Sequence, residues 1–586
     1  GMTHPEELGG QNLPYSLGSV MAEWFSSANH SWAMYPGLSQ GCMETLKEHG
    51  TSEQQKMFLN NLIGGQWTGT MCLTEPHCGS DLGMLKCKAV KNDDGTYSLT
   101  GTKIFISAGE HDMSDNIVHI VIARLPDAPS GTKGISLFVV PKFNAGTEGE
   151  KLDRNAVTCG SIEHKMGIKG SATCVINFDE AKGYLVGTEN RGLNCMFTFM
   201  NTARIGTGLE GLSASEAAFQ GALAYAKDRL QFRAMTGVKN PDGPADPIIN
   251  HPDVRRMLLT QKAFAEGNRA LAIYAMKLVD ISQANQDEAA KQLAESKLAL
   301  LTPIVKAFLT ETAQETTSYG MQVFGGHGFI KEWGMEQLAR DTRICTMYEG
   351  TTGIQAIDLL ARKVVGSNGK LLDVFTNEVK EYCKSIRDKT QFNAWSNSID
   401  KHVHEWHQIT EDIMQRAAKN PAELGAASVD YLMYSGYVVV GYFWLQMAVV
   451  AQQKLDDGTN DPEFYKAKLH TAKFYFDRLL TRTRSLVSAM ESGADNLMDM
   501  EEEQDMGMKR QQMELKVRGL AKSQKATAQL LRSNVRKFTR PQTFDIATSD
   551  YGTAISSAAS EAEAFLDEQR KDDDDKRGRG AGAVKM

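Results

Sequence analysis

The sequence predicts a mainly α-helical protein with a central antiparallel β domain. The chain has 586 residues, which at ~100–200 residues per domain corresponds to about three to five folded units. Short β-rich runs, separated by Gly, Asp, Asn and Pro, are concentrated between residues 97 and 178. Helical periodicity dominates before residue 70 and returns from about residue 193 onward.

The first 70 residues are predicted to form a helical N-terminal domain. Thr51 to Gln54 and Ser52 to Gln55 both have the spacing of a capping box, directly ahead of an apolar run that begins at Met57. Such a pattern marks the start of a helix.

A middle β domain is predicted over residues 71–188, where the period of the apolar residues changes. The β-rich runs are short and are bounded by turn residues, as expected for antiparallel strands. They are Tyr97–Thr100, Lys103–Ser107, Ile117–Ile122, Ile135–Val140 and Cys174–Phe178.

A helical bundle is predicted over residues 189–366, and an additional C-terminal helical domain over 371–570, joined by the linker Ser367–Gly369. Residues 571–586 contain a run of four Asp and a Gly/Ala/Arg tail, so they are predicted to be disordered. The long helical stretches of the bundle are Gly211–Arg233, Asp253–Gln283, Glu288–Gly320 and Thr352–Val365.

Composition excludes several classes of protein. The net charge of -8 argues against a nucleic-acid binder. The nine Cys are scattered without a CxxC pair, which argues against a disulfide scaffold and predicts no metal site. The opening residues lack the order of a signal peptide, so we expect a reduced, cytoplasmic protein.

The stretch Tyr431–Gln453 carries no charge and is about as long as a bilayer span. Its aromatic residues lie in the middle, whereas a membrane span places them near its ends. A buried helix of a bundle explains the stretch as well, and we favour that interpretation over membrane contact.

Three motifs have the residue types of a ligand site. Thr70–Asp81 (TMCLTEPHCGSD) can present backbone N–H groups and hydroxyls to a phosphate or a ring edge, although Pro76 also suits a merely stiffened loop. Gln322–Phe329 (QVFGGHGF) allows close approach of a backbone to a ligand, although it could simply end a helix.

The third motif, Met347–Gln355 (MYEGTTGIQ), contains Glu349 just before a predicted helix start. Thr352 and Gln355 have capping-box spacing, which predicts that the helix begins there. A carboxylate at this place can act as a helix-dipole partner. It can instead act as a general base whose pKa rises when a substrate removes water from the pocket.

In this order and layout, the three motifs resemble the acyl-CoA dehydrogenase family over roughly residues 30–365. Four further segments add to the resemblance, namely Met166–Ser171, Arg204–Gly206, Asp228–Phe232 and Arg340–Asp341. The C-terminal domain and the sequence segments Tyr35–Leu38 and Lys103–His111 are most similar to the 3-methylmercaptopropionyl-CoA dehydrogenase subfamily.

The resemblance implies FAD as cofactor, bound between the β domain and the bundle. Met71, Leu73, Thr74, Gly79 and Ser80 would line the isoalloxazine and pyrophosphate, and Thr351 would also contact the cofactor. Phe105 and Ser107 match an aromatic-x-hydroxyl pair that covers the flavin. Gln322, Gly325 and Gly326 match a backbone cradle for the ADP part. Arg229 and Phe232 match contacts from a neighbouring subunit, which implies a homodimer or a dimer of dimers.

For the CoA thioester, the resemblance implies contacts from Ser80, Ser171 and Arg204. Three residues before Arg204 the family commonly has Asp, where this chain has Asn201, so a contact there is altered. Glu349 matches the catalytic base. Some members place that base just before the helix arginine, but this chain has Ala203 there.

The activity implied is α,β-dehydrogenation of an acyl-CoA, 3-methylmercaptopropionyl-CoA or a short or medium fatty acyl-CoA, to the 2-enoyl-CoA. Electrons would pass to an electron-transfer flavoprotein. One alternative is an acyl-CoA oxidase that uses O₂, which the C-terminal domain keeps open. Another is a catalytically impaired homologue, because fewer residues precede Thr74 than the family's helical domain normally has, so residues 1–70 are expected to be incomplete.

Overall fold

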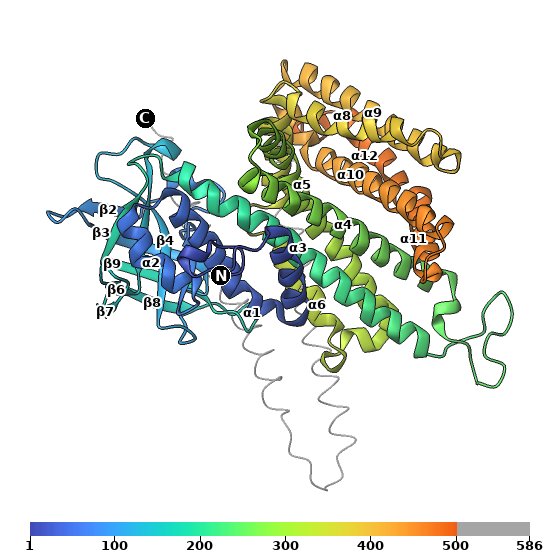
Figure 1. The fold of residues 1–586 in the computed structure, drawn as a ribbon, viewed down its shortest axis with the longest axis horizontal. Coiled ribbons are helices and arrows are strands. Elements are labelled where there is room, and N and C mark those ends of the chain that lie inside the picture. The colour runs from blue at the N-terminus through green and yellow to red at the C-terminus, as the bar shows by residue number, and fades with distance from the viewer. Residues whose placement is uncertain (501–586) are drawn as a thin grey trace, which may run out of the picture. The chain divides into compact units, whose positions relative to one another are not determined.

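The protein is represented by a computed structural model that describes residues 1–500. Residues 1–494 form one compact unit, and the second unit begins at Asp495, where the described part is the short helix α13 (Asp495–Met498). The predicted tail 571–586 and residues 501–570 of the predicted C-terminal domain lie outside the described residues. Within the first unit the strands form one β domain and most of the remaining chain is helical (Figure 1), which confirms the predicted fold class.

Two helices open the first unit, α1 (Tyr15–His49) and α2 (Ser52–Ile63). α1 is kinked at Asn29, whose backbone is not helical. The capping box predicted at Thr51 is confirmed: its hydroxyl accepts from the Gln54 N–H at 3.3 Å, and the Gln54 side chain accepts from the Thr51 N–H at 3.1 Å. The alternative box from Ser52 to Gln55 does not form.

The β domain contains every β-rich run that the sequence singled out. Antiparallel pairs predominate, but β1 pairs with β4 in parallel, so the sheet is mixed rather than purely antiparallel. A pairing between β4 and β5 closes the order β4-β2-β3-β9-β5 on itself. The strands are β1 (Trp67–Cys72), β2 (Lys88–Lys91), β3 (Tyr97–Ser107), β4 (Asn116–Arg124), β5 (Ile135–Pro141), β6 (Phe143–Ala145), β7 (Lys151–Arg154), β8 (Val157–Ile162) and β9 (Thr173–Val186).

The bundle that follows is built on three long helices, α3 (Gly192–Asp228), α4 (Pro252–Ala284) and α5 (Glu288–Phe324). Pro252 at the first turn of α4 and Asp287 at the N-cap of α5 explain where these helices begin. Two short helices, α6 (Met335–Thr342) and α7 (Thr352–Ile357), come next, and α7 continues as a π-helical turn, η8 (Asp358–Val365).

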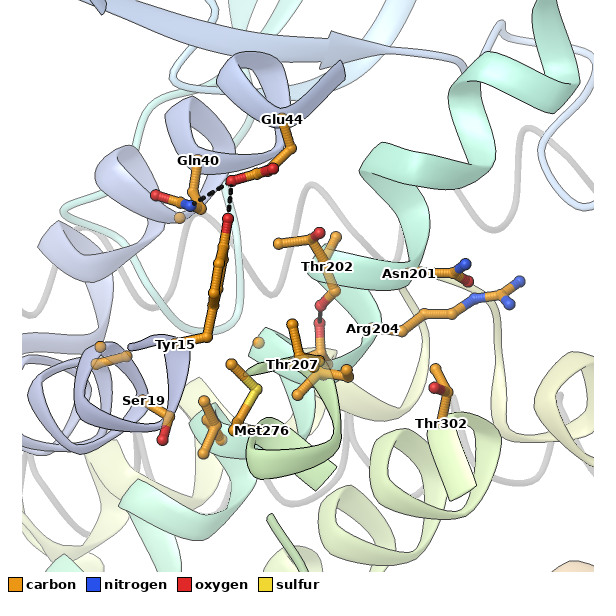
Figure 2. Close-up of a pocket in the computed structure, with 18 of the residues that line it drawn as sticks. Tyr15, Ser19, Gln40, Glu44, Asn201, Thr202, Arg204, Thr207, Met276 and Thr302 are labelled. Atoms are coloured by element: carbon orange, nitrogen blue, oxygen red, sulfur yellow. Dashed lines mark hydrogen bonds between the residues drawn. The ribbon is translucent and has the colours of Figure 1, made fainter. Parts of the chain in front are cut away.

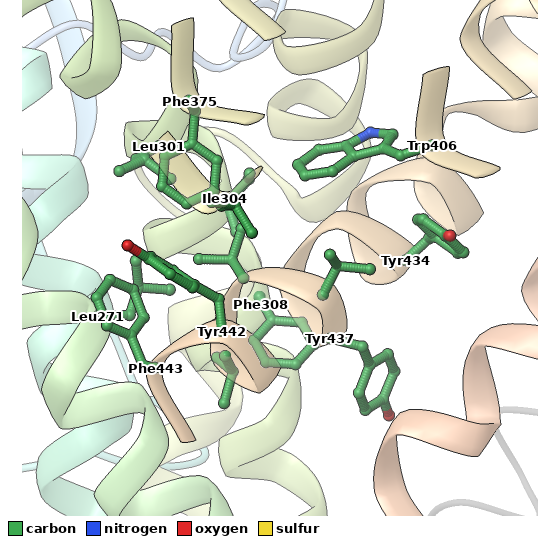
Figure 3. Close-up of a cluster of buried hydrophobic side chains, with 14 of the residues drawn as sticks. Leu271, Leu301, Ile304, Phe308, Phe375, Trp406, Tyr434, Tyr437, Tyr442 and Phe443 are labelled. Atoms are coloured by element: carbon green, nitrogen blue, oxygen red, sulfur yellow. The ribbon is translucent and has the colours of Figure 1, made fainter. Parts of the chain in front are cut away.

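Up to residue 494, the C-terminal module contains five α-helices. They are α8 (Lys370–Ser385), α9 (Asn393–Ala417), α10 (Ala422–Asp456), α11 (Pro462–Phe474) and α12 (Thr483–Glu491). Of these, α8, α10 and α11 pack on α4 or α5, while α9 and α12 pack on α10. The module's aromatic side chains meet aliphatic and aromatic side chains of the bundle in one apolar cluster (Figure 3).

Helix α10 contains the uncharged stretch Tyr431–Gln453. Among the described helices it is the one that is long and apolar enough to cross a membrane, and 78% of its most apolar window is buried inside the protein. Gly436 lies so close to the bundle that a Cβ there would sit 2.1 Å from the Phe308 ring. The burial fits the interpretation of this stretch as a core helix.

Candidate active site

A cavity of about 780 Å³ lies between α1, α3, α4, α5 and the turn that carries Glu349. Figure 2 shows Tyr15, Gln40 and Glu44 at one side of it and Asn201, Arg204 and Thr302 at another. Many of its walls are apolar, with Met21, Ala22 and Phe25 from α1 and Met276 and Val279 from α4. The cavity therefore offers an apolar chamber with polar groups at defined places.

Glu349 lies in a turn that the surrounding structure holds on both sides. Its backbone has a φ of 57°, a left-handed conformation that non-glycine residues seldom adopt. The Gln355 side chain donates to the Glu349 carbonyl at 3.0 Å, and Lys306 Nζ donates to the Gly350 carbonyl at 2.7 Å. These bonds fix an unfavourable conformation of a kind that is concentrated at functional sites.

The N-cap of α7 differs by one residue from the prediction. Thr351, not Thr352, caps the helix, and its hydroxyl accepts from the Ile354 N–H at 3.2 Å. Gln355 does not close a capping box, because its side chain is used by the Glu349 carbonyl. Thr352 instead donates its hydroxyl to Glu311.

The carboxylate of Glu349 is placed where water is scarce. Its Oε2 is buried and has no hydrogen-bond partner among the described residues. Burial raises the pKa of Glu349 to about 7, and the negative charge of Glu210 adds to this, whereas Lys306 and Arg204 oppose it. A carboxylate with a pKa near neutrality is suited to accept a proton from carbon.

Two buried cations balance this carboxylate. Lys306 is fully buried on α5, and burial lowers its pKa to about 8. Arg204 is 5% exposed, and its Nη1 lies 3.3 Å from Asp358 Oδ2 of η8. The side of the cavity around Glu349 is therefore rich in buried charge.

The predicted substrate residues divide into two groups. Asn201 and Arg204 line the cavity together with Glu349. Ser80 and Ser171 do not line it. Ser171 is 1% exposed, its Oγ is buried without a partner among the described residues, and its carbonyl accepts from Lys165 Nζ at 2.7 Å. Its role in substrate binding stays a prediction.

The segment predicted to line the flavin ring begins in β1 and contacts β3. Ile104 N–H donates to the Thr74 carbonyl at 2.9 Å, and the buried Lys103 Nζ reaches the Leu73 carbonyl at 2.9 Å and Glu75 Oε1 at 2.8 Å. Met71, Leu73, Thr74 and Ser107 are half-buried, and Gly79 and Ser80 are exposed. These contacts bring the two predicted halves of the flavin site side by side.

Phe105 presents its ring outward from this segment. Its side chain is 60% exposed, and its φ of 61° marks a bulge in β3. An exposed aromatic ring held by a strained backbone fits a surface on which a flat ring system stacks.

A second cavity, of about 430 Å³, brings together the residues predicted to hold the ADP part. Arg229 at the end of α3 faces Gln322, Gly325 and Gly326 at the end of α5. A Cβ at either glycine would meet no atom within 4 Å, so the backbone is open there, and Gly325 has a φ of 60°. An open glycine turn beside a guanidinium fits a pyrophosphate group. Phe232 lies just beyond and is 81% exposed.

Sequence reasoning missed the groups that surround Glu349, above all Lys306, Glu210 and His30. Lys306 carried a signal, because it is the one charged residue in the apolar run Ala299–Leu309. A lone lysine in such a run is buried with it. His30 and Glu210 carried none, since only the packing of α1 against α3 brings them together.

Comparison with known proteins agrees with this geometry. Residues 1–66, 70–181 and 190–364 match the N-terminal, middle and C-terminal domains of acyl-CoA dehydrogenase. Residues 375–501 match a domain described as acetyl-CoA dehydrogenase C-terminal like.

Two curated relatives match over most of their length. 3-Methylmercaptopropionyl-CoA dehydrogenase of Ruegeria pomeroyi is 42% identical over 85% of this chain and 84% of that protein. A broad-specificity linear acyl-CoA dehydrogenase of Mycobacterium tuberculosis is 36% identical over 85% of this chain and 84% of its own.

Solved structures share the fold. An acyl-CoA dehydrogenase complexed with FAD from Bacillus anthracis superposes with a TM-score of 0.68 at 22% identity, covering 83% of this chain and 80% of that one. Together with the extent and identity of the curated relatives, the matches show that this chain belongs to the acyl-CoA dehydrogenase family of FAD-dependent oxidoreductases.

Proposed function

We propose that this enzyme converts short- or medium-chain acyl-CoA thioesters to 2-enoyl-CoA thioesters, with 3-methylmercaptopropionyl-CoA among its substrates. The observation that carries the proposal is Glu349, whose Oε2 is buried, with no partner in residues 1–500, in a turn that lines the cavity of about 780 Å³. The relative from Ruegeria pomeroyi supports the thioether substrate.

Different residues of the chain have different roles in the proposed reaction. Glu349 takes the proton from the α-carbon, and the left-handed turn aims its carboxylate into the cavity. Bound FAD supplies the acceptor for the hydride that leaves the β-carbon. The apolar walls exclude water from the acyl chain, and Asn201 and Arg204 would orient the CoA side of the substrate.

The test is to add acyl-CoA thioesters to the purified flavoprotein without O₂ and follow flavin absorbance. A series of straight chains and thioether acids should bleach the flavin rapidly for at least one short or medium member. The same series on Glu349→Gln should leave the flavin oxidised. Rapid bleaching by Glu349→Gln would contradict the assignment of the base.

An electron-transfer flavoprotein is the proposed electron acceptor, and O₂ is the alternative. The C-terminal helical module keeps the oxidase alternative open, since the resemblance relates such a module to oxidase-like members as well. Stopped-flow mixing of the reduced enzyme with air distinguishes them. Slow reoxidation supports the flavoprotein acceptor, and fast peroxide formation would contradict it.

We also propose a cytoplasmic homodimer, or a dimer of dimers, in which Arg229 reaches the FAD of the neighbouring subunit. Support comes from the open cavity at Gly325 and from the 81% exposure of Phe232, an apolar side chain that an interface would cover. Arg229→Ala should lower flavin content and dimer stability together, measured by absorbance ratio and light scattering. Full flavin content in a stable monomer would contradict the proposal.

A further inference from the structure

A second carboxylate, Glu210 of α3, lies at the same cavity as Glu349 and interacts with groups from several elements. Its Oε2 accepts the hydroxyl of Tyr348 and lies 3.6 Å from Cys345 Sγ. His30 Nε2 of α1 lies 3.4 Å from the same oxygen. Glu210 therefore joins α1, α3 and the turn before α7.

Glu210 is connected to Glu349, the proposed catalytic base, through the turn that carries Glu349. Tyr348 is the residue directly before Glu349, so its bond to Glu210 holds the start of the strained turn against α3. Lys306 and Gln355 hold the other side, through the carbonyls of Gly350 and Glu349. The position of the Glu349 carboxylate thus depends on three anchors, and Glu210 is the one that carries a negative charge.

The charges that face Glu349 come from several elements. Lys306 from α5 and Arg204 from α3 are cationic, and Glu210 is the anion that opposes them. Lys306 itself also interacts with Cys345 and with Glu311 of its own helix, while Asp358 is paired with Arg204. Removing Glu210 would leave Glu349 facing these two cations without the anion that raises its pKa.

His30 in turn faces Glu210. Burial alone would lower the pKa of His30, but interaction with Cys345 and Glu210 raises it well above the ordinary value. A protonated His30 offsets part of the negative charge of Glu210. His30, a side chain of α1, therefore reduces the negative charge that Glu210 presents to Glu349.

We propose that Glu210 is a positioning residue for Glu349, which holds the turn through Tyr348 and by its charge makes Glu349 a stronger base, with His30 as the counter-charge. The proposal rests on the proposed function of Glu349. A base that binds its proton more tightly has more driving force to take one from carbon.

The decisive variant is Glu210→Gln, which removes the charge and can still accept the Tyr348 hydroxyl. The ionised form of Glu349 is the active form, so activity rises with pH through its pKa. This rise of kcat/KM with pH is the acid limb of the profile. Because the charge of Glu210 raises the pKa of Glu349, its loss should move the acid limb to lower pH by roughly half a unit or more. Glu216→Gln, the same change six residues later on α3, is the matched control and should leave the limb in place.

Two further variants separate charge from position. His30→Gln removes the counter-charge and should move the limb to higher pH, the opposite direction. Tyr348→Phe keeps the charge of Glu210 but frees the turn, so kcat should fall several-fold without a shift to lower pH. If Glu210→Gln does not fold, the upward shift in His30→Gln still tests the proposal. A limb that coincides with that of the native enzyme in both charge variants would overturn it.

An infrared titration tests Glu210 without relying on turnover. The C=O band of protonated Glu349, assigned by its loss in Glu349→Gln, should disappear at lower pH in Glu210→Gln than in the native flavoprotein. A shifted band in an enzyme that fails to oxidise acyl-CoA would uphold this inference and refute the proposed function. An unshifted band in an enzyme that oxidises acyl-CoA would refute this inference and uphold the proposed function.

Metal analysis of the purified protein completes the test. The ligand atoms of His30, Glu210 and Cys345 lie within 4.8 Å of one another. Stoichiometric Zn²⁺ on these side chains would replace the ion pair and overturn the proposal. A metal-free protein with the expected pH shifts would support it.

Discussion

Helix α5 takes part in two regions that use burial in opposite ways. Phe308 faces the C-terminal module, and two residues earlier Lys306 reaches toward the turn of Glu349. Around Phe308 the buried side chains are mainly apolar, and two of the polar groups among them are paired: Trp444 Nε1 donates to the Ala263 carbonyl at 3.1 Å and the Tyr475 hydroxyl to the Tyr437 carbonyl at 2.7 Å. The exception is Trp406 Nε1, which has no partner among the described residues. In Figure 3, Phe308 lies near Tyr437 of α10, and the centroids of these two rings are 5.1 Å apart in an edge-to-face arrangement.

Around Lys306 the same burial leaves polar atoms without hydrogen-bond partners among the described residues. Glu349 has an unpaired oxygen and a left-handed backbone, and Arg204 Nε is buried without a partner among the described residues. Such features each destabilise a fold by about 1–3 kcal/mol. The comparison teaches that one helix, α5, connects a well-packed apolar interface to a cavity wall with buried polar atoms that lack partners. The stability gained at the interface offsets the cost of burying those atoms.

The largest effect is expected from Glu349→Gln. Loss of a general base typically lowers turnover by ~10²–10⁴-fold. The flavin content should stay near that of the native protein, because the variant keeps the size of the side chain. Turnover with acyl-CoA and the flavin absorbance ratio measure the two effects, and near-normal turnover would refute the role of Glu349.

The same variant should be more stable than the native protein above neutral pH. Glu349 has its pKa raised to about 7, so the folded state binds a proton that the unfolded state releases above its ordinary pKa. The protonated Glu349 carries no cost of charge burial at acid pH. As pH rises to about 7, ionisation of the buried side chain lowers the free energy of unfolding of the native protein, whereas Gln does not ionise. At ~1.4 kcal/mol per pKa unit, Gln should gain at most about 3 kcal/mol at pH 8.

Thermal unfolding of both proteins at pH 5 and pH 8 measures this gain. The advantage of Glu349→Gln should be clear at pH 8 and should shrink at pH 5. An advantage of equal size at both pH values would show that the ionisation of Glu349 is not its cause.

The interface is tested by Gly436→Ala. The new Cβ would lie 2.1 Å from Cδ2 of the fully buried Phe308, so the helices must separate locally. Overpacking of this kind costs about 1–3 kcal/mol. Gly425→Ala, on the same helix, is the matched control, because a Cβ there meets nothing within 4 Å and alanine favours the helix by up to about 1 kcal/mol.

Denaturant unfolding should show opposite signs for these two glycine variants. The acid limb of activity should stay where it is in both, since neither residue faces Glu349. A stable Gly436→Ala protein would mean that α10 does not pack on Phe308 as closely as described.

The smallest effect is expected from Trp444→Phe. The change removes the indole donor, while the Ala263 carbonyl stays inside α4, where a carbonyl accepts the helical bond from the N–H four residues on. A net cost of about 1 kcal/mol is typical of a lost hydrogen bond. Chemical denaturation measures it, and an unchanged midpoint would show that the bond contributes nothing to stability.

The sequence predicted those features that depend on local pattern. The β-rich runs, the long helices of the bundle and the capping box at Thr51 follow from period and from capping residues, and the structure contains each of them. The family resemblance located Glu349, Asn201 and Arg204, which share one cavity.

What the sequence could not predict depends on contacts between distant segments. The parallel pairing of β1 with β4 depends on closure of the sheet, not on the pattern of either strand. Thr351 rather than Thr352 is the cap of α7, and the two residues predicted to form the capping box bond elsewhere: Thr352 donates to Glu311 and Gln355 to the Glu349 carbonyl. Glu210 and His30 come together only when α1 packs on α3, so no spacing along the chain reveals them.

The apolar cluster at Phe308 has a consequence for how the chain folds. One continuous cluster extends from Ile205 in the bundle to Met490 in α12 of the module, across the linker Ser367–Gly369. Segments that share a core in this way unfold together, so the linker separates two helical domains in sequence but not two cooperative units. Removal of the module at the linker would expose the ring of Phe308 to water on the same helix that holds Lys306 in place.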